Sequence, residues 1–479
     1  MPKSQPLRKD KVPPPVSDRK LRRLSTGERM EVQRIKRVKQ QQATDQVRKE
    51  GWTLHAKGDT GFFHALPTAA EEWTQLDIPK KLTLLECFLE CYPEDFVVDI
   101  LAHLKSNTWV YSSHGRRAIV GKNEIFRYLA IQIRSICHPP PTGVSRARKA
   151  LNRQASSNGI IRAEWQRHVA HFVQLLGGKP LSGAKLRVIN QYFLFDDAVL
   201  DLWSEYQQRL VSCLGLNLCG DEKMTTYYGR TPDSTAAKDT IGLWYFQLCC
   251  ATKYNFPFIL DIYMKKGKGD VFDPPTVSAT VKRWADIYLE KTGDNTILTF
   301  DKYYGSRDSI SLLLEQEREI WFLASINPSW WKETDQLLHR LHQQGDVRAM
   351  SHIDRGLLIY AQKKEDGDTA TTMSNFFQKR PRTTLKKNYS GPFDLYDSLF
   401  FLCDEANSQY KRFLVPGVVG RRSGNGKGAF SRNSILSFAL VNTTTAYFES
   451  NELSELEREN FDYGAALSEL ADDLWAMTV

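Results

Sequence analysis

A change of sequence pattern near residue 214 divides the chain into two kinds of structure. From 81 to 210, apolar residues recur every three or four positions, which predicts helices. After 214, short apolar runs rich in β-branched and aromatic residues alternate with turn residues, which predicts strands. The strand candidates are LGLNLCGD, IGLWYFQLCCATKY, FPFILDIYM, NTILTFD and EIWFLASI. Helical patterns over 276–293 and 308–319 separate the last three of them, so the chain combines a helical region with a mixed α/β sheet.

These changes of pattern also set the expected boundaries along the 479 residues. A possible strand and two polar or basic stretches follow the sheet region and are interpreted as an insertion, after which helical patterns resume. The expected parts are a basic, largely disordered arm at 1–50, a helical domain at 81–213, an α/β core at 214–328, an insertion at 329–390, returning helices at 391–448 and an acidic tail at 449–479.

Charge is unevenly distributed along the chain. Residues 1–50 carry 15 Lys or Arg and 6 Asp or Glu, a net +9, whereas residues 449–479 carry a net −8 and the stretch between carries +8. A basic surface favours a polyanion such as nucleic acid, because bound phosphates release counterions. The alternative for the arm, a solvated disordered segment, stays open. The candidate DNA-contacting residues lie in two basic arm segments and around the Gly-rich stretch 417–430: Arg22, Arg23, Arg34, Arg37, Lys411, Arg412, Arg421, Arg422 and Lys427.

Several protein classes are disfavoured by the sequence. There is no run of 18 apolar residues, and the first 15 residues lack an apolar segment, so we expect neither a membrane span nor secretion. None of the eight cysteines has C-x-x-C spacing, so we interpret them as reduced core thiols of an intracellular protein. Two histidine pairs at helical spacing lack a further zinc ligand nearby, and three tryptophans that could stack on unpaired bases are better read as core. They are His168 with His171, His339 with His342, and Trp165, Trp330 and Trp331.

Acidic residues stand at the ends of two predicted strands and at the start of one predicted helix. Asp221, followed by Glu222, ends the first strand candidate, and Asp301 ends the fourth. Asp394 and Asp397 lie three apart on one side of a helix. Convergence of these side chains would provide the oxygen ligands that Mg²⁺ prefers, with room for two ions. Each aspartate taken alone is more often a turn residue or an N-cap than a metal ligand.

The residues around these acids resemble the catalytic blocks of piggyBac-type transposases. The segment 221–230, DEKMTTYYGR, is similar to the first block, and 300–306, FDKYYGS, is similar to the second. The segment 388–397, NYSGPFDLYD, resembles the third block, and Asn442 with Tyr447 resembles a late helix of the family. The blocks keep the family's order over roughly residues 80–450. The sequence departs from the family at Lys302, where Asn is usual, and in having an acidic stretch in place of the family's Cys-rich zinc-binding tail.

The resemblance implies both a fold and a chemistry. It implies an RNase H-like catalytic core interrupted by the insertion, and a helical dimerisation and DNA-binding domain. It implies that Asp221, Asp301 and Asp394 are catalytic and bind two Mg²⁺ or Mn²⁺ ions, with Asp397 assisting. The implied reaction is phosphodiester hydrolysis and strand transfer in cut-and-paste transposition, on double-stranded transposon ends and TTAA targets, by a nuclear homodimer.

Two other functions stay open at this stage. The first is a domesticated, transposase-derived DNA-binding or chromatin protein without transposition activity, which the missing Cys-rich tail favours. The second is a different RNase H-like nuclease that cleaves without joining.

Overall fold

The computed structural model describes most of the helical region and of the sheet. The described residues are 34, 48, 50–55, 62–63, 73–105, 111–113, 116–118, 120–137, 181, 185, 188–189, 192–226, 235–237, 240–264, 277–291, 296–376, 378–379, 392–415 and 426–478. Most of the basic arm, and the stretch 416–425 with Arg421 and Arg422, lie outside them, as do His168, His171 and Trp165.

A ten-stranded mixed sheet forms the centre of the molecule, in the order β1-β13-β14-β15-β12-β11-β7-β9-β10 with β8 paired to β9. Strands β7, β11 and β12 run parallel to one another, and their other neighbours are antiparallel. All five strand candidates are confirmed, as β7, β9, β10, β11 and β12. The bounds are β1 Trp52–Leu54, β7 Asn217–Thr226, β8 Thr235–Ala237, β9 Thr240–Ala251, β10 Pro257–Met264, β11 Ile297–Phe300, β12 Trp321–Ser325, β13 Val347–His352, β14 Leu357–Lys363 and β15 Thr369–Ser374. Three two-stranded pairs complete the described strands: β2 Phe62–Phe63 with β16 Gln378–Lys379, β3 Gln75–Leu76 with β6 Val211–Cys213, and β4 Tyr111–Ser113 with β5 Arg116–Ala118.

The helices form where the sequence repeats at helical spacing, and polar caps set several of their starts. Thr83 and Glu86 form a capping box at α3, and the hydroxyl of Ser306 accepts a hydrogen bond from the Ser309 amide at the start of α11. The α-helices are α3 Leu84–Cys91, α4 Glu94–Lys105, α5 Lys122–Cys137, α9 Asp197–Arg209, α10 Val277–Lys291, α11 Arg307–Leu314, α12 Asp335–Leu338, α13 Pro392–Arg412, α14 Gly426–Ser450, α15 Glu455–Glu459 and α16 Tyr463–Ala476. The 3-10 helices are η1 Pro328–Trp330, η2 Lys332–Thr334 and η3 Ile353–Arg355.

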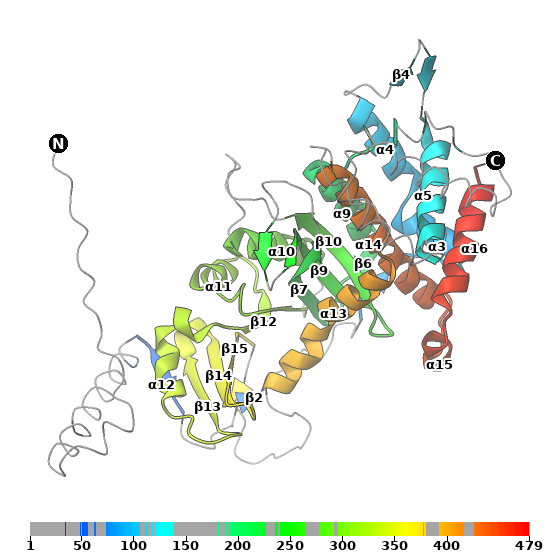
Figure 1. The fold of residues 1–479 in the computed structure, drawn as a ribbon. Helices are drawn as coiled ribbons and strands as arrows, with labels where there is room; N and C mark the ends of the chain where they lie inside the picture. Colours follow the sequence, from blue (N-terminus) through cyan, green and yellow to red (C-terminus); the bar gives the residue numbers. More distant parts are fainter. Residues whose placement is uncertain are drawn as a thin grey trace, which may run out of the picture.

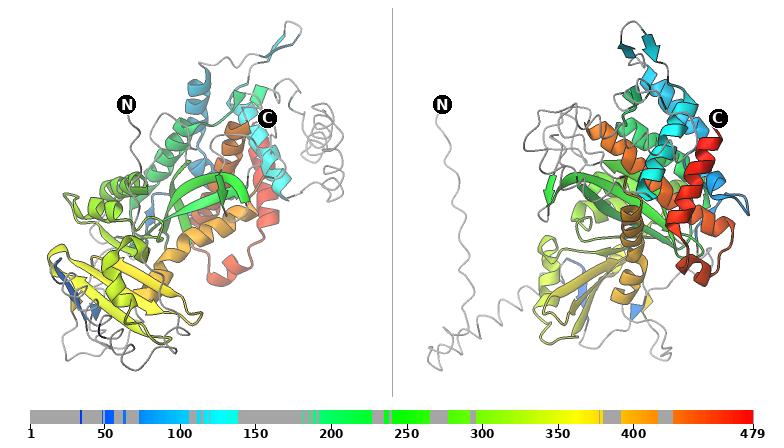
Figure 2. Two further views of the ribbon diagram at one scale, coloured as in Figure 1. Left: turned by 60° about the vertical axis from the view of Figure 1, so that its left-hand side comes forward. Right: turned by 45° about the vertical axis from the view of Figure 1, so that its right-hand side comes forward.

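Helices cover both faces of the sheet, and side chains alternate between the two layers. On one face Cys219, Leu243 and Cys249 pack into a core shared with α9, α13 and α14. On the other face Leu218 and Leu248 pack against α10 and α11. Figures 1 and 2 show α13 crossing from β7 and β9 toward β13–β15. Burial of each large apolar side chain contributes about 1.5–3 kcal/mol, so the two cores fix which face each strand residue occupies.

Two segments differ from what their sequence suggested. Within the expected insertion, β13, β14 and β15 continue the central sheet beyond β12, and β1 from the N-terminal region pairs with β13 at the edge. Residues 451–478, expected as an acidic tail, contain α15 and α16, and α16 packs beside α5 (Figure 1). Its apolar residues are buried at helical spacing while its acidic residues face outward, so the acidic composition marks one side of a packed helix. The domain boundaries themselves stay predictions.

The eight cysteines are free thiols, and six of them are buried, as expected for core thiols. None of the helices in the described part of the chain is long and apolar enough to cross a bilayer.

Candidate carboxylate site

The register of two parallel strands places Asp221 and Asp301 side by side. Gly220 of β7 pairs with Phe300, the last residue of β11, so Asp221 in β7 and Asp301 just after β11 are the next residues along the two chains. A Cβ on Gly220 would lie 2.5 Å from the indole ring of Trp284, so Gly220 faces α10. Because side chains alternate along a strand, Asp221 faces the opposite side, where α13 lies.

The pKa of Asp221 reflects its burial and the carboxylates nearby. Burial raises the pKa of Asp221 well above its usual range, and the neighbouring carboxylates of Glu222 and Asp301 raise it further. Close negative charges of this kind repel one another and would be relieved by a bound cation. Carboxylate oxygens are the ligands that hard divalent ions prefer, so Asp221 and Asp301 are of the right chemical kind to contribute to such a site.

The turn after β11 holds Asp301 in place. The backbone amide of Lys302 donates to the Asp301 carboxylate at 2.5 Å, and the amide of Tyr304 donates to the Asp301 carbonyl at 2.9 Å. Ser306 then caps α11. The aromatic and serine residues of this motif thus have local structural roles: they close the turn that presents Asp301.

Glu222, the residue after Asp221 in β7, has a partner in the turn that follows β11. The Tyr304 hydroxyl donates to the Glu222 carboxylate at 2.8 Å. Burial raises the pKa of Tyr304 well above its usual range, and the charges of Glu222 and Asp221 raise it further. Tyr304 therefore remains a proton donor to Glu222, whose carboxylate also lies close to that of Asp221.

The first two turns of α13, which carry Asp394 and Asp397, lie at the end of β11. The Tyr396 hydroxyl donates to the Phe300 carbonyl at 3.4 Å. Burial raises the pKa of Tyr396, as does the charge of Asp301, which places this tyrosine close to the carboxylates. Asp397 is exposed, and the side chain of Asp394 lies outside the described part of the chain. Among the described side chains, no three His, Cys, Asp or Glu residues are arranged to hold a metal ion. The structure thus brings two of the predicted acids together and sets the helix of the others beside them.

A buried lysine also lies on the α13 face, and sequence reasoning missed it. Lys223 is 5% exposed, and its Nζ donates to the Asn407 carbonyl at 3.2 Å and lies 4.6 Å from the Tyr410 ring. Burial lowers its pKa to about 8, with a contribution from the nearby charge of Lys411. The only available signal was its position two residues after Asp221, which places both on one face of the strand.

Asn442, singled out in the late helix, has a structural role. Its Oδ1 accepts from the Ile259 amide at 2.7 Å and its Nδ2 donates to the Ile259 carbonyl at 2.9 Å. The pairing of β10 with β9 shifts register between Ile259 and Asp261, so Asn442 satisfies backbone groups at a bulge. Tyr447 is partly buried and packs near Phe461.

The candidate DNA-contacting residues remain untested. Lys411 and Arg412 are exposed in the last turn of α13, where the Arg412 guanidinium lies 4.9 Å from the Tyr463 ring. Arg34 is exposed in a helical turn, and Lys427 lies in the first turn of α14 with its side chain outside the described part. Arg22, Arg23, Arg37, Arg421 and Arg422 lie outside the described residues altogether. Of the tryptophans, Trp331 is buried as expected, whereas Trp330 is 38% exposed.

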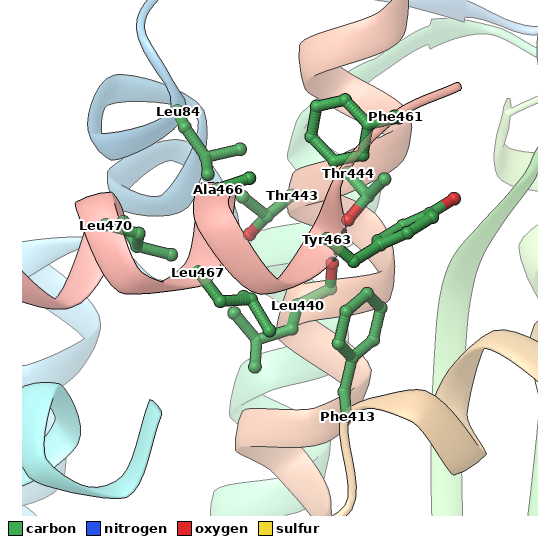
Figure 3. Close-up of a pocket in the computed structure, with 10 residues that line it drawn as sticks. All are labelled: Leu84, Phe413, Leu440, Thr443, Thr444, Phe461, Tyr463, Ala466, Leu467 and Leu470. Atoms are coloured by element: carbon green, nitrogen blue, oxygen red, sulfur yellow. Dashed lines mark hydrogen bonds between the residues drawn. The ribbon is translucent and has the colours of Figure 1, made fainter. Parts of the chain in front are cut away.

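A small cavity lies among the helices rather than at the carboxylates. It is lined by Leu84 of α3, Leu440 of α14 and Leu467 of α16, with Phe413 and Tyr463 beside them (Figure 3). Its volume of about 10 Å³ is the space of one water molecule. It is too small for a nucleotide or an organic cofactor.

Comparison with known proteins gives a likeness of fold. A solved structure described as a piggyBac transposase synaptic complex with hairpin DNA matches with a TM-score of 0.58 and 13% sequence identity, over 85% of this chain and 83% of that one. No protein-family model matches the sequence. No curated protein matches it either. The chain therefore shares the architecture of a piggyBac transposase, at a level of identity that speaks for fold alone.

Proposed function

We propose that this chain is a metal-dependent DNA transposase of the piggyBac type. The observation that carries the proposal is the placement of Asp221 and Asp301 at equivalent positions on adjacent parallel strands, with the first turn of α13 packed against the end of β11. The likeness of fold to a piggyBac transposase supports the same conclusion. The strand order β10-β9-β7-β11-β12, with both aspartates at its centre, supports an RNase H-like core.

In this proposal Asp221 and Asp301 hold divalent ions, Mg²⁺ or Mn²⁺, together with Asp394, and Asp397 assists. Two ions so held supply a nucleophile at neutral pH and charge stabilisation for the attacking and leaving oxygens. The protein's own part is positioning. The turn 301–306 fixes Asp301, Tyr304 donates a hydrogen bond to Glu222, and Tyr396 ties the N-terminal end of α13 to the end of β11.

The finer features of the reaction belong to the same proposal. They are double-stranded transposon ends as substrate, a TTAA target, strand transfer after hydrolysis, a homodimer, and action in the nucleus. The sequence resemblance in the three acidic blocks supports them. Basic residues of the arm and of the end of α13 supply the attraction to phosphate. The net charge is +9 over residues 1–50 and +8 over residues 51–448.

A reconstituted reaction tests the proposal and its two alternatives. The purified chain is incubated with Mg²⁺, DNA carrying the inverted repeats that flank the gene, and a TTAA-containing plasmid, alongside Asp301→Asn. We expect end cleavage and insertion at TTAA by the native chain alone. Cleavage without insertion indicates a nuclease, and binding of the repeats without cleavage indicates a DNA-binding protein; either result contradicts the proposal.

A further inference from the structure

Buried side chains on the sheet donate hydrogen bonds to backbone carbonyls of α13. We call Asn217, Gln247 and Lys223 the carbonyl anchors. Their bonds are Asn217 Nδ2 to the Leu399 carbonyl at 2.7 Å, Gln247 Nε2 to the Cys403 carbonyl at 3.3 Å and Lys223 Nζ to the Asn407 carbonyl at 3.2 Å. The three anchors are 5% exposed or less. They come from β7 and β9, and β7 also carries Asp221.

The spacing of the three acceptors suits a device that holds one side of α13 against the sheet. Residues 399, 403 and 407 are four apart, so their carbonyls lie along one side of α13. A helix lifted or tilted away from the sheet would leave the buried donors without partners in a water-poor interior. Backbone carbonyls recur at every residue of α13, so a side chain distinguishes one register from the next: Gln247 Nε2 also donates to Asn407 Oδ1, at 3.1 Å.

Lys223 is the least expected of the anchors. A buried cation loses its hydration, and an apolar residue of similar length would fill the same space without that loss. Lys223 instead bonds the Asn407 carbonyl, and its charge lies over the Tyr410 ring. At 5% exposure beneath α13 it is not available to contact DNA.

We propose that Lys223 is a positioning residue. With Asn217 and Gln247, it holds α13 on the sheet and thereby places the turn bearing Asp394 beside Asp221 and Asp301. The catalytic meaning of this role rests on the proposed function. The placement of the helix does not.

The test compares the full native chain with Lys223→Met, Lys223→Arg and Gln247→Leu. Asp201→Asn is the matched control, because it removes a partner of Arg283, at 2.8 Å, on α9 and away from α13. Four quantities are measured: the Mn²⁺ dissociation constant by electron paramagnetic resonance without DNA, kcat at saturating DNA, the DNA dissociation constant, and the melting temperature.

For Lys223→Met we expect Mn²⁺ affinity and kcat each to fall about tenfold or more, as for other groups that orient metal ligands from outside the coordination shell. DNA affinity stays unchanged, and Lys223→Arg recovers most of the loss. Asp201→Asn lowers the melting temperature without changing Mn²⁺ affinity or kcat. If Lys223→Met and Gln247→Leu behave as this control does, the anchors are merely structural and the proposal is wrong. If Lys223→Met does not fold, Gln247→Leu decides on the same criteria.

Hydrogen exchange separates this inference from the proposed function. If the native chain neither binds Mn²⁺ nor cuts DNA, the proposed function fails, but amide exchange in residues 396–412 still reports on how firmly α13 is held, because these amides bond within the helix. Faster exchange there in Lys223→Met than in Asp201→Asn supports the positioning role. Equal exchange in the two variants overturns it.

Discussion

The two faces of β7 differ in the kind of side chain they carry and in what they leave room for. Toward α10 the strand presents Leu218 and Gly220, packed so closely that a methyl group at Gly220 would overlap Trp284. Toward α13 it presents a row of polar or polarisable side chains, each with a partner or a neighbouring charge: Asn217, Cys219, Asp221 and Lys223. Packing on the α10 face fixes the backbone of β7. The α13 face can therefore carry polar and charged side chains in defined positions. The predictions below separate these two contributions.

The largest effect is expected on the α13 face. Asp221→Asn and Asp301→Asn each remove a carboxylate from the site and should reduce DNA cleavage by about 10³-fold or more, measured as single-turnover rates with Mg²⁺. Asp221→Asn should also raise the melting temperature of the metal-free chain, because it removes a charge held close to other carboxylates. The exposed Asp354→Asn is the control and should change neither quantity. Native-like cleavage by Asp301→Asn would separate this face from catalysis.

On the α10 face, Gly220→Ala should lower stability rather than chemistry per folded molecule. The added Cβ would lie 2.5 Å from the Trp284 ring, and overpacking of this kind costs about 1–3 kcal/mol. Gly464→Ala, near the start of α16, meets only a carboxylate oxygen at 3.3 Å and should change stability by about 0.5 kcal/mol at most. Denaturant unfolding measures both. Equal stability of the two variants would show that the α10 face has room for a methyl group at Gly220, which would contradict close packing there.

Lys223 gives the α13 face a pH dependence of stability. Its pKa is lowered to about 8 in the folded chain, against 10.5 when solvated, so between these values the unfolded chain binds more protons. The contribution of this group to the free energy of unfolding should therefore rise as pH increases from about 8 to about 10.5, by at most about 3 kcal/mol. Denaturant unfolding of the native chain and of Lys223→Met across this pH range isolates the contribution of Lys223. A constant difference between the two would refute the shift.

The smallest effects are expected at the exposed end of α13. Lys411→Ala should leave the chain at least as stable, because it removes a like charge near Lys223. It should reduce the salt dependence of DNA binding by about one phosphate contact, a slope change of about 0.9. Arg412→Ala should instead lower stability by about 0.5–1 kcal/mol, because its guanidinium lies 4.9 Å from the Tyr463 ring. Binding measured from 50 to 200 mM salt distinguishes them. An unchanged slope in Lys411→Ala would remove this residue from the DNA-contacting set.

Local sequence patterns predicted where strands and helices form better than they predicted which strands pair with one another. The strands β7, β9, β10, β11 and β12 are visible as apolar runs between turns, and α10 and α13 as helical repeats. That β1 joins β13 at the far edge depends on residues about 300 positions apart, for which no local pattern exists. The residues of α16 were interpreted as an acidic tail because of their composition. The spacing of Leu467, Leu470 and Leu474 nevertheless indicates a buried helical face.

The candidate site was also predicted only in part from the sequence. Asp221 and Asp301 could be predicted because both follow apolar runs, and in parallel neighbouring strands such positions meet at one edge. The sequence does not show that β7 and β11 are neighbours in the sheet. This pairing is what brings the two aspartates together. Lys223, Tyr304 and Tyr396 were missed because each acts through a contact across the fold.

Anomalous diffraction from crystals grown with Mn²⁺ tests the central claim most directly. The account predicts manganese peaks bound by carboxylate oxygens of Asp221 and Asp301, with a ligand from Asp394 at the first turn of α13. Asp301→Asn crystals should lose occupancy at these positions while their backbone is unchanged. Manganese bound only elsewhere, or carboxylates of Asp221 and Asp301 that diverge with no density between them, would contradict the account.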